Sequence, residues 1–134
     1  MKIIGIDYGA KRIGIAVGDT EIGIAFPREI LPNDEHVFDV LQQILVQEKI
    51  VIIVVGNPIL PSGGETKETQ VAQEFAEQCK IRFSQVSTLL WDERYSSRTA
   101  QKSAREMGHT SKTFRGNLDA ASAAILLQSY LDSL

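Results

Sequence analysis

Cysteine and histidine are scarce in this sequence of 134 residues, which contains one cysteine, Cys79, and two histidines, His36 and His109. A single cysteine excludes an intramolecular disulfide, and two distant histidines leave no Cys/His cluster of the kind that binds zinc. Long hydrophobic runs are also missing, since no apolar stretch approaches the roughly 18 residues that a membrane span needs. Asp7 interrupts the apolar N-terminal run and no small-residue cleavage site follows, so we expect no signal peptide and a cytoplasmic protein.

The bulk composition is that of an ordinary soluble protein, with 43% hydrophobic and 23% charged residues. A chain of this length suits one domain with a sizeable core, and the sequence contains no internal repeat, linker or low-complexity segment. We therefore expect residues 1–134 to form a single domain. Cys79 lies in the apolar stripe of a predicted helix, where we expect a packed thiol rather than a reactive one.

Basic residues are concentrated in one segment, although the net charge of the whole chain is −3. Residues 94–115 contain six bases and one acid, Glu106, a local charge of +5 that leaves −8 on the rest of the chain. A basic segment on an acidic protein favours a patch that binds a polyanion, with a solvated helix face as the alternative. The bases are Arg94, Arg98, Lys102, Arg105, Lys112 and Arg115.

The N-terminal part of the chain predicts three consecutive strands. Residues 3–6 form an apolar, β-branched run that ends at Asp7, and residues 13–17 form an alternating run after a Gly-bearing basic turn. Residues 21–31 supply a third strand with apolar residues at alternate positions. The short turns between these strands predict an antiparallel meander.

The middle of the chain predicts a helix, a buried strand and a second helix. Asn33 or Asp34 is the expected N-cap of a helix that continues to about Glu48. Residues 50–55 are apolar throughout, which predicts a central strand parallel to a neighbour. The glycine- and proline-rich loop 56–66 follows that strand, where it is either a plain connection or a phosphate-binding loop with amides of the next helix.

The C-terminal part predicts one more strand and two helices. Residues 86–91 form the strand, which is followed directly by Asp92 and Glu93. One helix is expected from Ser96 or Ser97 to Met107, and the last helix from Asn117 onward. The complete pattern predicts an α/β fold with a mixed five-stranded sheet, in which the meander joins two parallel strands between flanking helices.

Three acidic residues occupy equivalent positions at element ends. Asp7 ends the first strand, Glu93 follows the fifth, and Asp119 lies in the first turn of the last helix. If the parallel strands are neighbours, three carboxylates share one sheet edge and raise one another's pKa unless a cation neutralises them. Mg²⁺ or Mn²⁺, which prefer oxygen ligands, are the cations expected there. Pairs of such ions catalyse phosphodiester hydrolysis.

Each acid also has a purely structural interpretation. Asp7 could start a turn, and the helix dipole favours Asp119 whether or not it has a function. Successive strand side chains face opposite ways, so only one of Asp92 and Glu93 can point to a shared site.

Four motifs in this order resemble the bacterial YqgF/RuvX family over essentially the whole chain: GIDYGAKRIGIAVGD, GNP with its glycine loop, DERYSS and LDAASAAILLQSYL. The resemblance implies a ribonuclease H-like fold. Members of the family are described as Holliday-junction resolvases and as nucleases that process the 5′ end of the small-subunit ribosomal RNA precursor. The family's acidic residues fall on Asp7, Glu93 and Asp119, so the resemblance selects Glu93 rather than Asp92.

The sequence departs from the family pattern at two places. Ser96 and Ser97 replace a pair of threonines that is common after the D-E-R motif, and they keep the hydroxyl groups. Asn117 stands where a lysine commonly precedes the last Asp, with Arg115 nearby, so the basic contribution to the site differs.

We therefore predict a metal-dependent endonuclease of structured RNA or branched DNA that uses Mg²⁺ or Mn²⁺. Its expected partners are the precursor of 16S ribosomal RNA, branched DNA, and the ribosome or a pre-ribosomal particle, with no membrane. Asp7, Glu93 and Asp119 are the predicted catalytic and metal-binding residues. Tyr95 is expected to be a core residue rather than one that stacks on a base. The predicted nucleic-acid-binding residues are Lys11, Arg12, Arg94, Arg98, Lys102, Arg105, Lys112 and Arg115.

Two other functions fit parts of the sequence. One is a non-catalytic ribosome-maturation factor whose acids are structural. The other is an ATP-binding domain of the actin, Hsp70 and sugar-kinase type, because Asp7-Tyr8-Gly9 resembles its first phosphate loop, although such proteins need two lobes. No motif in the sequence indicates recognition of a 2′-hydroxyl or of a base edge, so both RNA and DNA fit as substrates.

Overall fold

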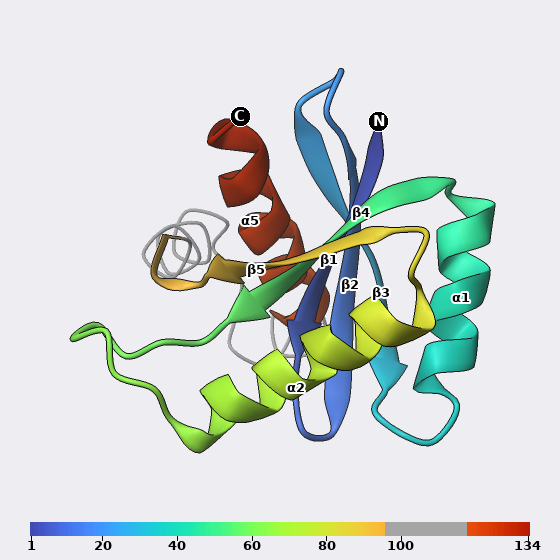
Figure 1. The fold of residues 1–134 in the computed structure, drawn as a ribbon. Coiled ribbons are helices and arrows are strands. Elements are labelled where there is room, and N and C mark those ends of the chain that lie inside the picture. The colour runs from blue at the N-terminus through green and yellow to red at the C-terminus, as the bar shows by residue number, and fades with distance from the viewer. Residues whose placement is uncertain (96–117) are drawn as a thin grey trace.

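The computed structural model describes residues 1–95 and 118–134, apart from the side chains of Leu118 and Asp119. The described part contains five strands and three helices, arranged around a single sheet (Figure 1). In chain order they are β1 (Lys2–Tyr8), β2 (Arg12–Asp19), β3 (Ile24–Pro32), α1 (Val37–Gln47), β4 (Ile50–Asn57), α2 (Lys67–Arg82), β5 (Ser87–Asp92) and α5 (Leu118–Asp132). The helix predicted between Ser96 and Met107 falls outside the described residues.

The sheet has the predicted mixed arrangement, with strand order β3-β2-β1-β4-β5. β1 pairs antiparallel with β2, and β2 antiparallel with β3, which confirms the meander. β4 lies parallel to β1 on one side and to β5 on the other. The carboxyl ends of β1, β4 and β5 therefore lie at the same edge of the sheet.

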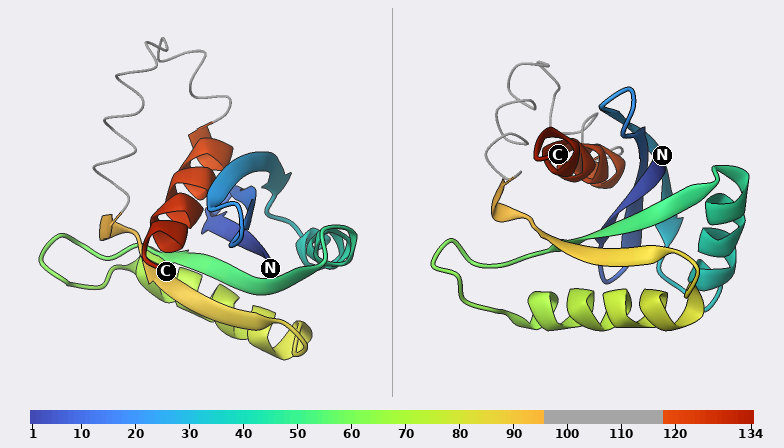
Figure 2. Two further views of the ribbon diagram at one scale, coloured as in Figure 1. Left: turned by 90° about the horizontal axis from the view of Figure 1, so that it is seen from above. Right: turned by 45° about the horizontal axis from the view of Figure 1, so that its top comes forward.

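Helices cover both faces of the sheet, with α5 on one face and α1 and α2 on the other (Figure 2). Successive side chains of β1 point to opposite faces of the sheet and contribute to both hydrophobic layers. Ile4 and Ile6 pack beneath α1 and α2, while Ile3 packs beneath α5. Cys79 lies in the α1–α2 layer, and burial raises the pKa of its thiol to about 12. The predicted packing of this thiol in the core is therefore confirmed.

α5 approaches the sheet closely because glycines of the strands face its buried residues, which include Ala123 and the larger Leu127 and Leu131. A Cβ atom on Gly5 would lie 2.8 Å from Cβ of Leu127, and one on Gly18 would lie 3.1 Å from Cδ1 of Leu131. Gly18 pairs with Ile3, so the chain of α5 runs opposite to β1. The N-terminal end of α5 therefore points toward the carboxyl end of β1.

The start of α1 differs from the prediction. The N-cap is His36, without a side-chain cap, rather than Asn33 or Asp34. Asp34 instead accepts a hydrogen bond from the backbone N–H of His36 at 2.9 Å, and Asn33 Nδ2 donates to the Gly9 carbonyl at 2.8 Å. The two polar side chains therefore shape the approach to the helix and brace the β1–β2 turn.

The third strand starts at Ile24, three residues later than predicted, and the apolar side chains at its beginning face solvent. Ile24 is 46% exposed and Phe26 is 60% exposed. None of the helices in the described ranges is both long and apolar enough to cross a membrane.

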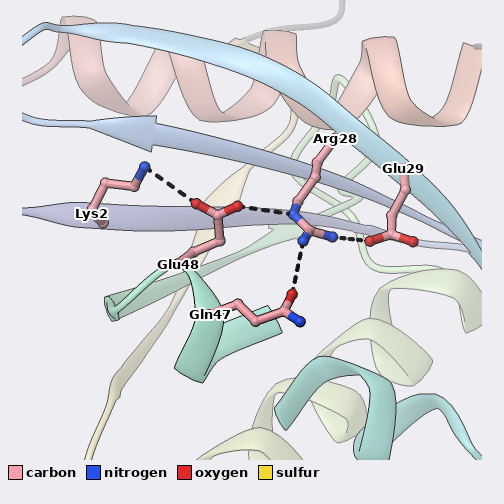
Figure 3. Close-up of polar contacts among 5 residues, drawn as sticks. All are labelled: Lys2, Arg28, Glu29, Gln47 and Glu48. Carbon is pink, nitrogen blue, oxygen red and sulfur yellow. Dashed lines mark hydrogen bonds and ion pairs between the residues drawn. The ribbon is translucent and has the colours of Figure 1, made fainter. Parts of the chain in front are cut away.

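A charged network ties β1, β3 and the end of α1 together at the amino end of β1 (Figure 3). The Glu48 carboxylate forms ion pairs with Lys2 Nζ and Arg28 Nε, each at 3.3 Å. Arg28 also donates to Gln47 and pairs with Glu29. Burial raises the pKa of Glu48, but hydrogen bonds from Arg28 and Lys2 outweigh it and hold that pKa below its usual value. This network secures the end of the sheet that is remote from Asp7.

One side chain of α5 binds the outer edge of β3 where the strand begins. Gln128 Oε1 accepts a hydrogen bond from the Ala25 N–H at 2.9 Å, and Gln128 Nε2 donates to the Gly23 carbonyl at 2.8 Å. The carboxamide thus supplies hydrogen-bond partners at the beginning of this edge, where the backbone could otherwise pair with another chain.

We predict that Gln128→Leu lowers the free energy of unfolding by about 1–3 kcal/mol, because two partly buried backbone groups lose their partners. Urea denaturation measures this change. Gln42→Leu, at an exposed position on α1, is the matched control and should change stability by less than about 0.5 kcal/mol. Equal stability of the two variants would show that Gln128 does not secure the edge.

Candidate active site

Asp7 lies on the α5 side of the sheet, at the carboxyl end of β1. Its position follows from strand alternation, since Gly5, two residues earlier, faces Leu127 of α5. Tyr8 faces the other way and packs on Phe75 of α2, with ring centroids 4.7 Å apart. The strand therefore presents a carboxylate to one layer and an aromatic ring to the other.

Glu93 reaches the same side from the end of β5. Its backbone N–H donates to the Asn57 carbonyl at 3.1 Å, which continues the pairing of β5 with β4. Its carboxylate lies over Gly56, where a Cβ atom would be only 2.5 Å from Glu93 Oε1 and 3.1 Å from Cδ. The absence of a side chain at Gly56 provides the space that Glu93 occupies.

Asp7 and Glu93 are hydrogen-bonded to each other through their carboxyl groups. Burial raises the pKa of Glu93 above its ordinary value, the contact with Asp7 acts in the opposite direction, and the charge of Asp92 raises it further. A hydrogen bond between two carboxyl groups requires a proton on one of them, so the pair titrates as a unit. Two acids 86 positions apart in the sequence thus form one anionic site.

The backbone of Asp119 lies at the same end of the sheet. It is the second residue of α5 and precedes Ala123 by one helical turn, about 6 Å. The Ala123 carbonyl contacts the position of Gly5, and Asp7 lies about 6.6 Å beyond Gly5 along β1. Because α5 and β1 run in opposite directions, both displacements lead to the same end of the sheet.

The Asp119 side chain is outside the described part of the structure, so its role as a third ligand stays a prediction. Among the side chains that are described, no group of three His, Cys, Asp or Glu residues is close enough together to hold a metal ion. Asp7 and Glu93 supply two carboxylates of the predicted three.

Asp92 faces the opposite side from Glu93 and is engaged by Arg94. Arg94 Nε donates to both carboxylate oxygens at 2.9 and 3.1 Å, and Nη2 donates to Oδ2 at 2.6 Å. These hydrogen bonds hold the pKa of Asp92 below its usual value, although burial opposes them. Arg94 therefore neutralises the acid that does not contact Asp7.

Three of the predicted phosphate-binding residues, Lys11, Arg12 and Arg94, lie in the described part of the chain, close in sequence to Asp7 or Glu93. Lys11 and Arg12 are exposed in the turn that follows Asp7. Nη1 of Arg94 would lie 3.6 Å from a Cβ atom on Gly63, so this guanidinium adjoins the glycine loop. Arg98, Lys102, Arg105, Lys112 and Arg115 are outside the described residues, as are Ser96, Ser97 and Asn117.

The glycine loop is a folded hairpin in its middle part. Leu60 and Gly64 are joined by a backbone hydrogen bond of 2.9 Å, and Gly63 has a φ of +90°, which favours glycine. Thr66 and Thr69 form a capping box at the start of α2. The box uses the Thr69 amide that a phosphate at this helix end would otherwise receive.

Tyr95 is not a core residue, contrary to the prediction. Its side chain is 64% exposed, and its ring lies against Trp91, with centroids 5.3 Å apart. Sequence periodicity could not reveal this, because Tyr95 follows the last strand and its neighbours Arg94 and Ser96 define no apolar face.

The whole chain matches one family model, which is described as "RuvX: Holliday junction resolvase" and covers residues 1–133. The chain belongs to the RuvX family. A relative from Sulfurihydrogenibium sp. is 36% identical over 99% of this chain and 91% of its own length, and one from Burkholderia ambifaria is 37% identical over 98% and 89%. Both carry the name "Putative pre-16S rRNA nuclease".

Solved resolvase structures share the fold of this RuvX member. The RuvC protein of Thermus thermophilus, in complex with a Holliday junction substrate, matches with a TM-score of 0.59 at 14% identity, over 99% of this chain and 94% of that one. The Fowlpox virus resolvase, in complex with Holliday junction DNA, matches with a TM-score of 0.57 at 13% identity, over 99% and 98%. The predicted ribonuclease H-like fold is confirmed.

Gly56 is a residue of the site that sequence analysis missed. A glycine after an otherwise apolar strand signals close approach of another group, but the sequence does not say which group approaches. The structure identifies it as the Glu93 carboxylate.

We predict that Gly56→Ala moves the Glu93 carboxylate out of its buried position and lowers its pKa toward the ordinary value. Carbon-13 NMR titration of the Glu93 carboxyl group measures this shift. Gly64→Ala is the matched control, because a Cβ atom there would make only ordinary contacts of 3.5 Å or more. An unchanged titration of Glu93 in Gly56→Ala would refute the proposed packing.

We also predict that Glu93→Gln stabilises the metal-free protein at pH 7 by about 0.5–2 kcal/mol. Because the pKa of Glu93 is raised in the folded state, its stabilising contribution is complete at low pH and is lost as pH rises through the raised pKa. Thermal unfolding in EDTA should show the advantage of the variant shrinking as the pH falls. Glu74→Gln, at an exposed position, is the control, and a less stable Glu93→Gln at pH 7 would contradict the prediction.

Proposed function

We propose that this chain is a metal-dependent endonuclease that hydrolyses phosphodiester bonds. The observation that carries the proposal is the pair of carboxyl groups of Asp7 and Glu93, which meet at the carboxyl ends of β1 and β5. Side chains at this edge are available to ligands in parallel sheets. The names of the relatives support a nucleic acid as the substrate.

The donor set fits a hard divalent cation. Both described ligands are carboxylates, which Mg²⁺ and Mn²⁺ prefer, and burial of Glu93 beside Asp7 makes the charged pair unfavourable without a neutralising partner. Asp7, Glu93 and Asp119 would hold the metal. When bound, such ions activate water and stabilise the leaving oxygen in phosphodiester hydrolysis.

The remaining residues of the site bind and orient the substrate. Lys11 and Arg12 are exposed beside Asp7 and contact phosphates of the bound strand. Arg94, held by Asp92, offers Nη1 to a phosphate on the side of the glycine loop. The basic residues from Arg98 to Arg115, which lie outside the described part of the chain, are predicted to bind further phosphates.

The physiological substrate that we propose is the precursor of 16S ribosomal RNA, cut during maturation of its 5′ end. The names of relatives that match almost the entire chain include this substrate. Branched DNA is the second candidate, because the family description names Holliday junctions. In either case the enzyme works on nucleic acid in the cytoplasm, for the RNA within or near a pre-ribosomal particle.

The test is cleavage of labelled ribosomal RNA precursor and of a DNA four-way junction, side by side, in Mg²⁺ or Mn²⁺. Asp7→Asn should reduce the rate at least about 100-fold, equivalent to about 2.7 kcal/mol of transition-state stabilisation. Asp39→Asn changes an exposed acid on α1 and should leave the rate unchanged.

The two substrates separate the candidate functions. Cleavage of the RNA alone supports the ribosomal role, and cleavage of the junction alone supports the resolvase role. Cleavage that survives Asp7→Asn rejects the mechanism. Tight RNA binding without metal-dependent cleavage would identify a non-catalytic maturation factor instead.

A further inference from the structure

Tyr95 is an exposed aromatic residue two positions after Glu93. Its ring lies outside the core, with 64% of the side chain accessible to solvent. An exposed aromatic ring beside a site for a polymer is informative, because a tyrosine combines a large apolar face with a low entropy cost of binding.

The Trp91 ring packs against one side of the Tyr95 ring. The two rings lie 5.3 Å apart at an interplanar angle of 42°. Trp91 is itself fixed to α5, since its Nε1 donates to Ser129 Oγ at 3.1 Å and its ring meets the Tyr130 ring edge-on at 5.4 Å. Tyr95 is therefore supported on one side and exposed on the other.

This supported ring lies on the side of the sheet that carries the carboxylates. Trp91 packs beneath α5 with Leu127, and Glu93 follows it by one strand repeat, about 6.6 Å. Because Glu93 contacts Asp7 on that same side and precedes Tyr95 by only two residues, we expect a nucleic-acid strand with a phosphate at the carboxylates to extend to Tyr95.

We propose that Tyr95 is a stacking platform for one unpaired nucleobase next to the phosphate that is cut. This inference rests on the proposed nuclease function and adds a substrate requirement to it. A base inside a continuous duplex is already stacked on both faces, whereas a single-stranded, frayed or junction nucleotide offers a face to the tyrosine. Tyr95 thus selects locally unpaired RNA or DNA over duplex.

The test is binding of labelled single-stranded 12-mers of RNA and of DNA, measured by fluorescence anisotropy in EDTA to prevent cleavage. Tyr95→Ala should weaken binding about 5- to 150-fold, as expected for one stacked base. Tyr95→Phe should bind like the wild type, because the ring rather than the hydroxyl carries the interaction. Tyr95→Leu, which keeps apolar contact with Trp91, should bind like Tyr95→Ala.

Two controls separate stacking from general loss of affinity. Phe26→Ala removes an aromatic ring of similar exposure, 60%, on β3 and should leave binding unchanged. In 12-mers with one abasic position moved along the strand, one position should weaken wild-type binding and abolish the difference between wild type and Tyr95→Ala. A perfectly paired duplex should show less than about a twofold effect of Tyr95→Ala.

Each outcome decides the inference. Equal binding of wild type and Tyr95→Ala, weak binding of Tyr95→Phe, or an abasic series without a sensitive position overturns it and leaves the nuclease function intact. A larger effect on RNA than on DNA indicates that the stacked base belongs to the ribosomal substrate. A larger effect on DNA indicates that it belongs to branched DNA. A wild type that binds neither polymer also overturns this inference, whereas the proposed nuclease function is decided separately by the cleavage assay with metal.

Discussion

The contact between Asp7 and Glu93 is the constraint on which the arrangement of this protein depends. Two carboxyl groups do not pack together in a partly apolar site without a shared proton or a cation. The parallel pairing of β4 with β1 and β5 nevertheless brings them together, and burial raises the pKa of Glu93. The fold therefore accepts an unfavourable local charge in order to keep an anionic site, a common conflict between stability and function.

Glycines, which have no side chain, make the close approaches around this contact geometrically possible. Gly5 and Gly18 let α5 lie directly on the sheet, which directs its N-terminal end toward Asp7. Gly56 leaves room for the Glu93 carboxylate. Placing a helix and a carboxylate this close to a strand requires a backbone with no Cβ at the point of contact.

The two faces and the two ends of the sheet differ in composition and in role. The face beneath α1 and α2 is a large apolar core, while the face beneath α5 carries the carboxylates and Trp91 at one end. Charged residues at the opposite end, centred on Glu48, connect β1, β3 and the end of α1 (Figure 3). The site is thus built on regular elements rather than on a long loop, which suits accurate positioning of reacting groups.

The sequence by itself determined the order of the described strands and helices and the mixed character of the sheet, because periodicity and the apolar run 50–55 are local signals of strand type. It predicted that Asp7 meets Glu93 only on the condition that the parallel strands are neighbours, and the strand order β1-β4-β5 of the structure supplies that condition. Tertiary structure alone decided that Arg94 engages Asp92, that Gly56 accommodates Glu93, and that the ring of Tyr95 is exposed. These features depend on contacts between side chains from different elements. Local patterns specify what an element is, but only packing specifies which neighbour each side chain meets.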